Sequence, residues 1–247
     1  MSIGQKDCMG GSMTGILAIE TATDTCSIAV SIDGQIRERH EVAPRQHNEL
    51  LFSMLNELLP NGTLREQGID LIAYGCGPGS FTGLRIAASA VQGLAYSCGL
   101  PAVAVPTLAI LAQNALGRNE VSAADTILCA LDARVNEVYS AVYQYEHKLP
   151  VLRDGPWACS PADLALEMPG SLTVVGDGGR FLEQFSEALR VTVVATLVDI
   201  VPMARDMIPI AAVKFQNGEI QSPGQVQPVY VRDEISWKKL AQQGKPA

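Results

Sequence analysis

A nine-residue turn at positions 77–85 limits the fold of this chain more than any other stretch. It reads GPGSFTGLR, follows an apolar run at 69–76 and precedes a helix-like run at 82–98. Three glycines and a proline require a backbone that turns sharply, and Ser80 or Thr82 can cap the helix that follows. The sequence therefore predicts a strand-to-helix turn whose free N–H groups meet either an anion or a closely packed partner.

We expect a structural role for this turn. Arg85 lies one turn into the following helix, where it can bind an anion or pair with a carboxylate that fixes the turn. Pairing is the favoured interpretation, because buried arginines are most often paired. The residues assigned to the structural turn are Gly77, Pro78, Gly79, Ser80, Phe81, Thr82 and Arg85.

The composition indicates an α/β protein with small side chains at its close contacts. Of 247 residues, 47% are hydrophobic and only 5% aromatic, which leaves Ala, Val, Leu and Ile to build the core. The formal net charge is −8, and the longest basic run is Lys238-Lys239. Tight nucleic-acid binding needs clustered Lys and Arg, so we expect another molecule to supply most of any contact to a nucleic acid.

Scattered cysteines and the lack of a long apolar run predict a cytoplasmic protein. The cysteines form no CxxC pair and no ligand-like spacing, which favours reduced thiols over disulfides or a metal site. No apolar run approaches the ~20 residues that span a bilayer, so no membrane association is expected. The six cysteines are Cys8, Cys26, Cys76, Cys98, Cys129 and Cys159.

The order of predicted elements repeats once along the chain. Each half begins with three strands and continues with alternating helices and strands. The predicted fold class is therefore α/β, with two lobes and a duplicated βββαβαβα unit. The strands that open the two halves are expected at 15–21, 26–32, 35–42, 126–131, 137–145 and about 149–152.

The same pattern predicts the domain organisation. We expect an N-terminal, partner-binding lobe at 13–118 and a C-terminal lobe at 119–220, whose last helix packs back on the first lobe. An extended tail follows at 221–247, and residues 1–12 are interpreted as a leader or an expression scar. Within the second lobe, helices are predicted at 160–168 and 181–189.

Two helices of the first half have unusual surfaces. The helix at 47–59 carries apolar residues over about half of its circumference or more, well beyond the ~100° stripe of a one-sided surface helix. Either two layers of its own domain bury it, or one side faces a partner protein. The helix at 82–98 carries small residues, and since glycine costs ~1 kcal/mol relative to alanine in a helix, we expect another backbone to approach it closely.

The first strand-to-strand turn is a candidate phosphate clamp. Glu20, Thr21 and Thr23 flank Ala22, at a place where two-lobed ATP-using folds prefer an aspartate and a glycine. A hydrogen-bonded hairpin turn is therefore the favoured interpretation.

Two turns of the second half are weaker candidates. Asp132 and Arg134 lie in a turn without glycine, where we expect a structural salt bridge. Gly176, Asp177 and Gly178 follow a strand and can accept the adenine and ribose of a nucleotide, although an ordinary loop is favoured. We assign none of these turns as a confident cofactor site.

The sequence carries no signature of metal-dependent or nucleophilic catalysis. His40, His47 and His147 lack ligand spacing on one helix face, and no HExxH or GxSxG occurs. We expect His47 to be a polar surface residue at a helix start. No catalytic residue and no metal ligand are assigned.

Five segments together resemble the bacterial TsaB family, also called YeaZ. They are ILAIETATDTCSIAV at 16–30, RQHNELL at 45–51, AYGCGPGSFTGLRIA at 73–87, ALDARVNEVYSAVY at 130–143 and the tail PVYVR…WKKL at 228–240. The resemblance covers essentially all of 15–240. It implies the two-lobed actin/Hsp70/sugar-kinase fold and a non-catalytic role in placing threonylcarbamoyl on the tRNA adenosine next to the anticodon.

The resemblance also implies partners. TsaB proteins work with the catalytic paralogue TsaD and the ATPase TsaE, bind TsaD through helices of the N-terminal lobe, and form a homodimer through the same surface when alone. The tRNA is then reached only through the complex. The implied partner interface comprises Leu50, Leu51, Met54, Leu55, Leu58, Gly83, Ala87, Ala90, Val91 and Leu94.

Departures from TsaD support this division of labour. TsaD carries a metal-binding HxxxH, and the matching positions here are Thr107 and Leu111, which cannot hold a metal in that role. No resident cofactor is expected, and ATP or ADP binds only at a composite interface, if at all. An ATP-dependent small-molecule kinase or carbamoyl transferase of the same fold is the alternative hypothesis, and a peptidase is a weaker third.

Overall fold

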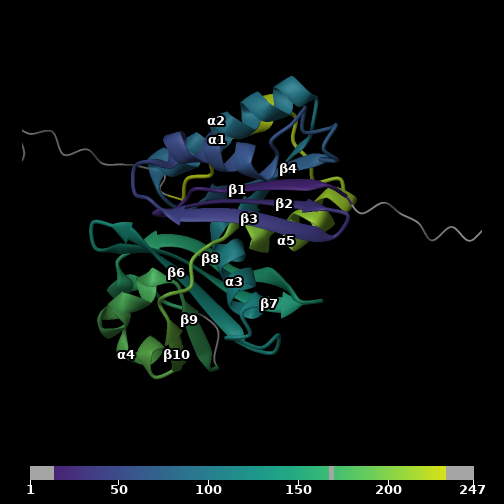
Figure 1. Cartoon of the computed structure of the whole chain (residues 1–247). Coiled ribbons are helices and arrows are strands. Elements are labelled where there is room, and N and C mark those ends of the chain that lie inside the picture. Colours follow the sequence, from purple (N-terminus) through teal and green to yellow (C-terminus); the bar gives the residue numbers. More distant parts are fainter. Residues whose placement is uncertain (1–13, 167–169, 232–247) are drawn as a thin grey trace, which may run out of the picture.

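The computed structural model describes residues 14–166 and 170–231, so the predicted leader and the tail beyond 231 lie outside the described residues. The described chain forms two five-stranded sheets, one in each lobe, with helices α3 (Thr107–Gly117) and α5 (Ala204–Gln216) packed between them (Figure 1). Within these ranges no helix is long and apolar enough to cross a membrane. The five cysteines they contain are all unpaired.

The first sheet has the order β3-β2-β1-β4-β5. Strands β1, β2 and β3 pair antiparallel, and β4 and β5 run parallel to β1. Asp33 and Gly34 have φ angles of 49° and 77°, which a tight hairpin turn between β2 and β3 requires. The strands are β1 (Ile16–Glu20), β2 (Thr25–Ile32), β3 (Gln35–Val42), β4 (Leu71–Gly77) and β5 (Ala102–Pro106).

The two faces of this sheet are covered by different helices. Helices α1 (His47–Leu58) and α2 (Phe81–Cys98) pack on the outer face, where Leu51, Ala87 and Val91 join its core. Helix α5 packs on the inner face, and its Met207 contributes to a second cluster with residues of β1 and β4. Strands β1, β2 and β4 are therefore buried on both faces, as their near-continuous apolar sequences require, whereas the edge strand β3 is mostly exposed.

The second sheet repeats the plan of the first. Its order β8-β7-β6-β9-β10 matches β3-β2-β1-β4-β5, and helix α3 covers its inner face. This equivalence confirms the predicted two-lobed, duplicated α/β fold. The strands are β6 (Thr126–Arg134), β7 (Glu137–Glu146), β8 (Leu149–Cys159), β9 (Leu172–Val175) and β10 (Val193–Leu197).

The two helices predicted at 160–168 and 181–189 are wrong. In place of a helix at 160–168 there is one 3₁₀ turn, η1 (Pro161–Asp163), after which Leu164 is extended and buried; residues 167–169 lie outside the described part. In place of a helix at 181–189, the 3₁₀ segment η2 (Asp177–Gln184) precedes the short helix α4 (Glu187–Arg190). An extended, buried Phe185 separates them, because Ser186 caps a new helix.

The end of the described chain runs back over the first lobe. We call residues 221–231 the C-terminal strap; it contains the 3₁₀ turn η3 (Pro223–Gln225). Gln221 exchanges two backbone hydrogen bonds with Ala102 at the edge of β5, and the Val229 N–H donates to the Cys76 carbonyl oxygen at 2.8 Å. The strap thereby covers one edge of the first sheet and reaches the turn at 77–85.

Candidate functional site

The turn at 77–85 lies between the first hairpin turn and the C-terminal strap. A Cβ on Gly77, whose φ is +114°, would lie 2.6 Å from the Val229 carbonyl oxygen, and a Cβ on Gly79 would lie 2.5 Å from that of Ala22. A Cβ on Gly83 would collide with the Thr21 carbonyl oxygen. Of the two interpretations of this turn, these contacts support the second: the glycines allow close backbone packing and do not form an anion site.

Helix α2 is capped by Ser80, as predicted, but the Arg85 side chain has other partners than predicted. The Gly83 N–H donates to Ser80 Oγ at 3.2 Å, which makes Ser80 the helix cap. The Arg85 guanidinium is exposed, lies 3.9 Å from the Phe81 ring centroid and donates to the Tyr230 hydroxyl at 3.1 Å. Pairing of Arg85 with a carboxylate is therefore wrong, because an aromatic residue of the strap takes that place.

A cleft of about 610 Å³ separates the two lobes beside this turn. Its walls come from the hairpin turn after β1, the turn at 77–85, the end of β6 and the strap. Asp24, Asp132 and Asp177 line it together with Arg134. The cleft therefore carries more negative than positive side chains, which opposes binding of a polyphosphate.

Two N–H groups of the first turn, those of Ala22 and Thr25, are already occupied. The Ala22 N–H donates to Glu20 Oε1 at 2.6 Å, and the Thr21 hydroxyl donates to the Gly83 carbonyl oxygen at 2.8 Å. The Thr25 N–H donates to Thr23 Oγ1 at 3.3 Å. These bonds are those of the hydrogen-bonded hairpin turn that the sequence predicts.

Glu20 itself is completely buried. Burial raises the pKa of its carboxyl group from 4.5 to about 7. The hydrogen bond from the Ala22 N–H lowers this pKa, but its effect is smaller than that of burial. A carboxyl group that has no exposed surface cannot coordinate a metal or phosphate in this conformation.

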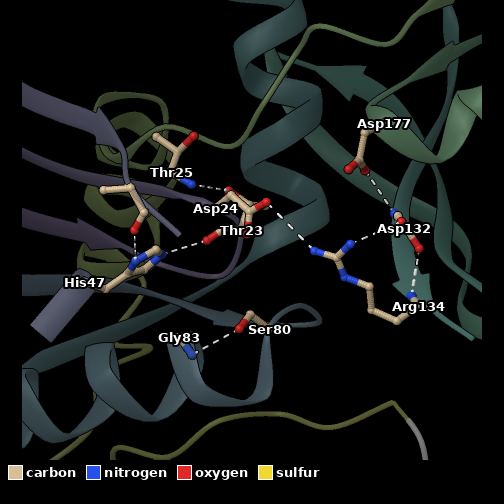
Figure 2. A network of polar contacts seen from close by, with 10 residues as sticks. Thr23, Asp24, Thr25, His47, Ser80, Gly83, Asp132, Arg134 and Asp177 are labelled. Atoms are coloured by element: carbon tan, nitrogen blue, oxygen red, sulfur yellow. Dashed lines mark hydrogen bonds and ion pairs between the residues drawn. The ribbon is translucent and has the colours of Figure 1, made fainter. Parts of the chain in front are cut away.

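The equivalent turn of the second lobe is also closed by its own side chains (Figure 2). The Asp132 N–H donates to Asp177 Oδ1 at 2.9 Å, and the Arg134 N–H donates to Asp132 Oδ1 at 2.7 Å. The Arg134 guanidinium lies 3.8 Å from Asp132 and 3.8 Å from Asp24 of the other lobe. The predicted salt bridge between Asp132 and Arg134 is confirmed, and Asp24 extends it across the cleft.

The glycines after β9 also serve close packing. A Cβ on Gly176, whose φ is +104°, would collide with the Ala130 carbonyl oxygen, and one on Gly178 would lie 2.8 Å from the Ala130 carbonyl carbon. The Gly176 N–H donates to the Leu197 carbonyl oxygen at 3.0 Å. This arrangement agrees with the favoured interpretation as an ordinary structural loop.

His47 does not lie on the surface, so this prediction is wrong. It is buried, with Nε2 at 2.7 Å from the Thr23 carbonyl oxygen and Nδ1 at 3.2 Å from the Ala43 carbonyl oxygen (Figure 2). The first residue of α1 is thereby tied to the hairpin turn after β1. The only sequence signal for this contact is a polar residue at a helix start, which also fits an exposed position.

Two further groups have environments unsuited to catalysis. Thr107 Oγ1 accepts a hydrogen bond from the Gly77 N–H at 3.2 Å, and Leu111 is buried against the second sheet. Burial and then the Glu20 charge raise the pKa of Cys26 to about 11 and that of Cys76 to about 12. These thiols stay protonated near neutral pH and are weak nucleophiles.

A second hollow lies on the outer face of the first lobe, between α1 and α2. We call it the helix groove; its volume is about 580 Å³ and its lining includes Leu51, Phe52, Phe81, Ile86 and Ala90. Phe52 is 54% exposed and Phe81 49% exposed. Large exposed aromatic side chains that line one hollow typify a binding surface.

Most residues of the interface implied by the resemblance lie beneath this groove. Leu50 and Leu94 are partly exposed, and the other eight are buried in the core of the first lobe: Leu51, Met54, Leu55, Leu58, Gly83, Ala87, Ala90 and Val91. The side chains that a partner can touch are their exposed neighbours. Sequence reasoning missed Phe52 and Phe81 as surface residues, although the wide apolar arc of α1 was a signal for the first.

Comparisons with known proteins agree with this architecture. A family model described as TsaD, tRNA N6-adenosine threonylcarbamoyltransferase, matches residues 39–204. The chain is 34% identical over 235 residues to the tRNA threonylcarbamoyladenosine biosynthesis protein TsaB of Escherichia coli strain K12, covering 91% of this chain and 97% of that protein. The TsaB protein of Haemophilus influenzae is 33% identical, covering 91% and 96%.

A solved structure gives the same result. YeaZ from Pseudomonas aeruginosa matches with a TM-score of 0.79 at 33% identity, covering 88% of this chain and 100% of that chain. Fold and site together define a two-lobed α/β protein, built from a duplicated unit, whose strand-end turns are closed by their own side chains. The chain belongs to the TsaB family of tRNA threonylcarbamoyladenosine biosynthesis proteins, as its sequence predicts.

Proposed function

We propose that this chain is a non-catalytic subunit in tRNA threonylcarbamoyladenosine synthesis, which binds and activates the catalytic paralogue TsaD together with the ATPase TsaE. The observation that carries the proposal is the helix groove, with Phe52 and Phe81 exposed on a lobe whose other large apolar side chains are mostly packed. A helix pair of the paralogue, or of a second copy when the chain is alone, covers this groove. The tRNA is reached through the complex.

The groove has the features of an interface centre. Its floor is formed by Leu51 and Ala90, which are buried, and its rim carries the aromatic rings of Phe52 and Phe81. The exposed small residues Ser89 and Gly93 of α2 let a partner helix approach closely, whereas the rings supply anchors with large contact area. Arg85 adds one charged group at the rim.

Two observations support a non-catalytic role. The N–H groups of Ala22 and Asp132 are bonded to the carboxyl groups of Glu20 and Asp177, so they cannot cradle a phosphate without rearrangement. The resemblance to TsaD places Thr107, which cannot act as a metal ligand in that role, at the position of a metal-binding histidine. We propose that ATP or ADP binds only where the complex adds groups from a partner.

An omission assay tests the proposal with a matched pair of variants. TsaD, TsaE, tRNA and the activated threonylcarbamoyl donor are combined with the wild-type chain, with Phe52→Asp or with Val42→Asp, a valine that is 71% exposed on β3. Modified adenosine is counted by mass spectrometry, and binding to TsaD by gel filtration. Phe52→Asp is expected to lose both binding and modification, and Val42→Asp neither.

Two outcomes would contradict parts of the proposal. Modification that persists with Phe52→Asp, or without the chain, overturns the claim that this groove activates TsaD. Loss of modification by Asp132→Asn or Asp177→Asn in an intact complex would reveal a working site in the cleft and overturn the non-catalytic role.

A further inference from the structure

The two sheets have four edge strands, and three of them are protected against pairing with another chain. β3 carries four charges, Arg37, Glu38, Arg39 and Glu41, among eight residues. β5 is bridged by the strap through Ala102 and Gln221. β8 contains two prolines, an arginine and an aspartate. Charges, prolines and covering segments are among the devices by which proteins protect sheet edges.

The fourth edge strand, β10, has none of these charges or prolines. It lies at the end of the second sheet and pairs with β9 on one side (Figure 1). The eight residues at 191–198 read VTVVATLV, without a charge, a proline or a glycine. Val194 is 69% exposed, at the point where the register against β9 shifts. Uncharged, β-branched segments of this kind pair readily with another strand.

Charges flank this strand in a self-complementary order. Arg190, which is exposed and pairs with the exposed Glu183 of its own chain at 3.0 Å, lies at its N-terminal side, and the exposed Asp199 lies at its C-terminal side. An antiparallel pair of two such strands brings each Arg190 near the Asp199 of the other copy, whereas a parallel pair places like charges together. A two-fold interface has this property, since every contact occurs twice.

We propose that β10 is a second association surface, at which two copies of this chain pair antiparallel edge to edge. Backbone hydrogen bonds between the two β10 strands would join the second sheets of both copies into one ten-stranded sheet, with Val194 of each copy near the two-fold axis. Strands of five residues bury little area, so the pair is a concentration-dependent dimer rather than a permanent one.

This surface is distinct from the helix groove. β10 belongs to the second lobe, and α1 and α2 cover the outer face of the first (Figure 1). Pairing at β10 leaves both grooves open. Two copies joined in this way can each bind a further protein at α1 and α2, which would give assemblies with two copies of each subunit.

Sedimentation velocity over a concentration series tests the pairing in the full chain. Phe52→Asp serves as the background, because it blocks association through the helix groove. This background is expected to retain a concentration-dependent dimer, which Val194→Lys abolishes and Val42→Lys, the same change on the protected edge strand β3, does not. Circular dichroism checks that each variant is folded.

A charge reversal gives a second test that does not depend on the Val194 variant. Arg190→Asp alone and Asp199→Arg alone are each expected to weaken the dimer by about tenfold, and the double variant to restore it. A background variant that stays monomeric at every concentration overturns the proposal. The proposal is also overturned if Val194→Lys and Val42→Lys weaken the dimer equally. It is overturned as well if the double variant does not restore the dimer that the single charge reversals weaken.

The two association surfaces are separated by one more measurement. TsaD binding is expected to be unchanged by Val194→Lys and lost with Phe52→Asp. If Phe52→Asp still binds TsaD, the proposal that TsaD binds at the helix groove is wrong. The proposal for β10 is then still tested separately, by the effect of Val194→Lys on the dimer.

Discussion

The Glu20 carboxyl group lies directly against the α-carbon of Gly75, across the adjacent parallel strands β1 and β4, so that a Cβ on Gly75 would collide with it. One carboxyl oxygen of Glu20 accepts the Ala22 N–H, and the other, Oε2, is buried without a hydrogen-bond partner among the described residues. Burying an ionised carboxylate in such surroundings is costly. Burial therefore favours the protonated, neutral form of the carboxyl group, and its pKa rises to about 7.

Gly75→Ala is expected to destabilise the protein by about 2 kcal/mol or more, because a methyl group must displace a buried carboxyl group. Urea unfolding followed by circular dichroism measures the change. The control is Gly93→Ala in α2, where a Cβ would have no heavy atom within 4 Å. That variant is expected to be neutral or to stabilise by up to ~1 kcal/mol. Equal effects of the two changes would contradict the contact with Glu20.

Glu20 is expected to make the protein less stable as the pH rises. Its pKa is 4.5 in ordinary surroundings and about 7 in the fold, so between these values the folded state binds more protons than the unfolded state. The contribution of Glu20 to stability is therefore intact below about pH 4.5 and falls as the pH rises through about 7, by on the order of 3 kcal/mol.

Glu20→Gln isolates this effect. Glutamine keeps an oxygen for the Ala22 N–H and cannot ionise, so the variant is expected to gain stability relative to the wild type as the pH rises from 5 to 8, by roughly the amount that Glu20 loses. Asp206, whose pKa burial raises to about 6, acts in the same direction in both proteins and cancels in the difference. A difference that does not depend on pH would contradict the raised pKa.

The fold could be predicted from the sequence because its local signals agree. The repeated strand pattern, the glycine turn at 77–85 and the Ser80 cap each indicate the element that the structure contains. The prediction failed at the outer face of the second sheet, where short 3₁₀ turns and a four-residue α-helix take the place of the helices predicted at 160–168 and 181–189. There buried Leu164 and Phe185 hold the backbone extended, and such tertiary contacts override local propensity.

The candidate site was less predictable, since its contacts join residues far apart in sequence. The stacking of Tyr230 on Phe81 spans 149 positions, and nothing local indicates that Arg85 meets an aromatic residue instead of a carboxylate. Apolar spacing on α1 and α2 indicated a partner surface, but periodicity cannot distinguish side chains beneath a groove from those at its rim. For that reason Met54 and Ala87 were assigned to the interface although both are buried.

Core and rim residues of α1 are expected to respond in opposite ways. Met54→Ala removes a buried side chain and is expected to cost about 2–5 kcal/mol of stability. Phe52→Ala removes a half-exposed ring and is expected to cost less than about 1 kcal/mol, while weakening association at the helix groove by tenfold or more. Thermal unfolding and gel filtration measure the two properties. A Phe52→Ala variant that is as unstable as Met54→Ala would place Phe52 in the core.

The isolated chain is expected to bind MgATP with a Kd weaker than about 1 mM, since three aspartates line the interlobe cleft and the Ala22 and Asp132 N–H groups are occupied. Isothermal titration calorimetry at neutral pH measures this. Asp177→Asn tests whether charge alone prevents binding, because asparagine retains an oxygen for the Asp132 N–H while removing one negative charge. If the Asp177→Asn variant also shows no MgATP binding, the occupied N–H groups are sufficient to explain why the nucleotide does not bind. Saturable binding to the wild type that Arg134→Ala weakens would instead show that the Arg134 guanidinium, released from Asp24 and Asp132, holds a phosphate.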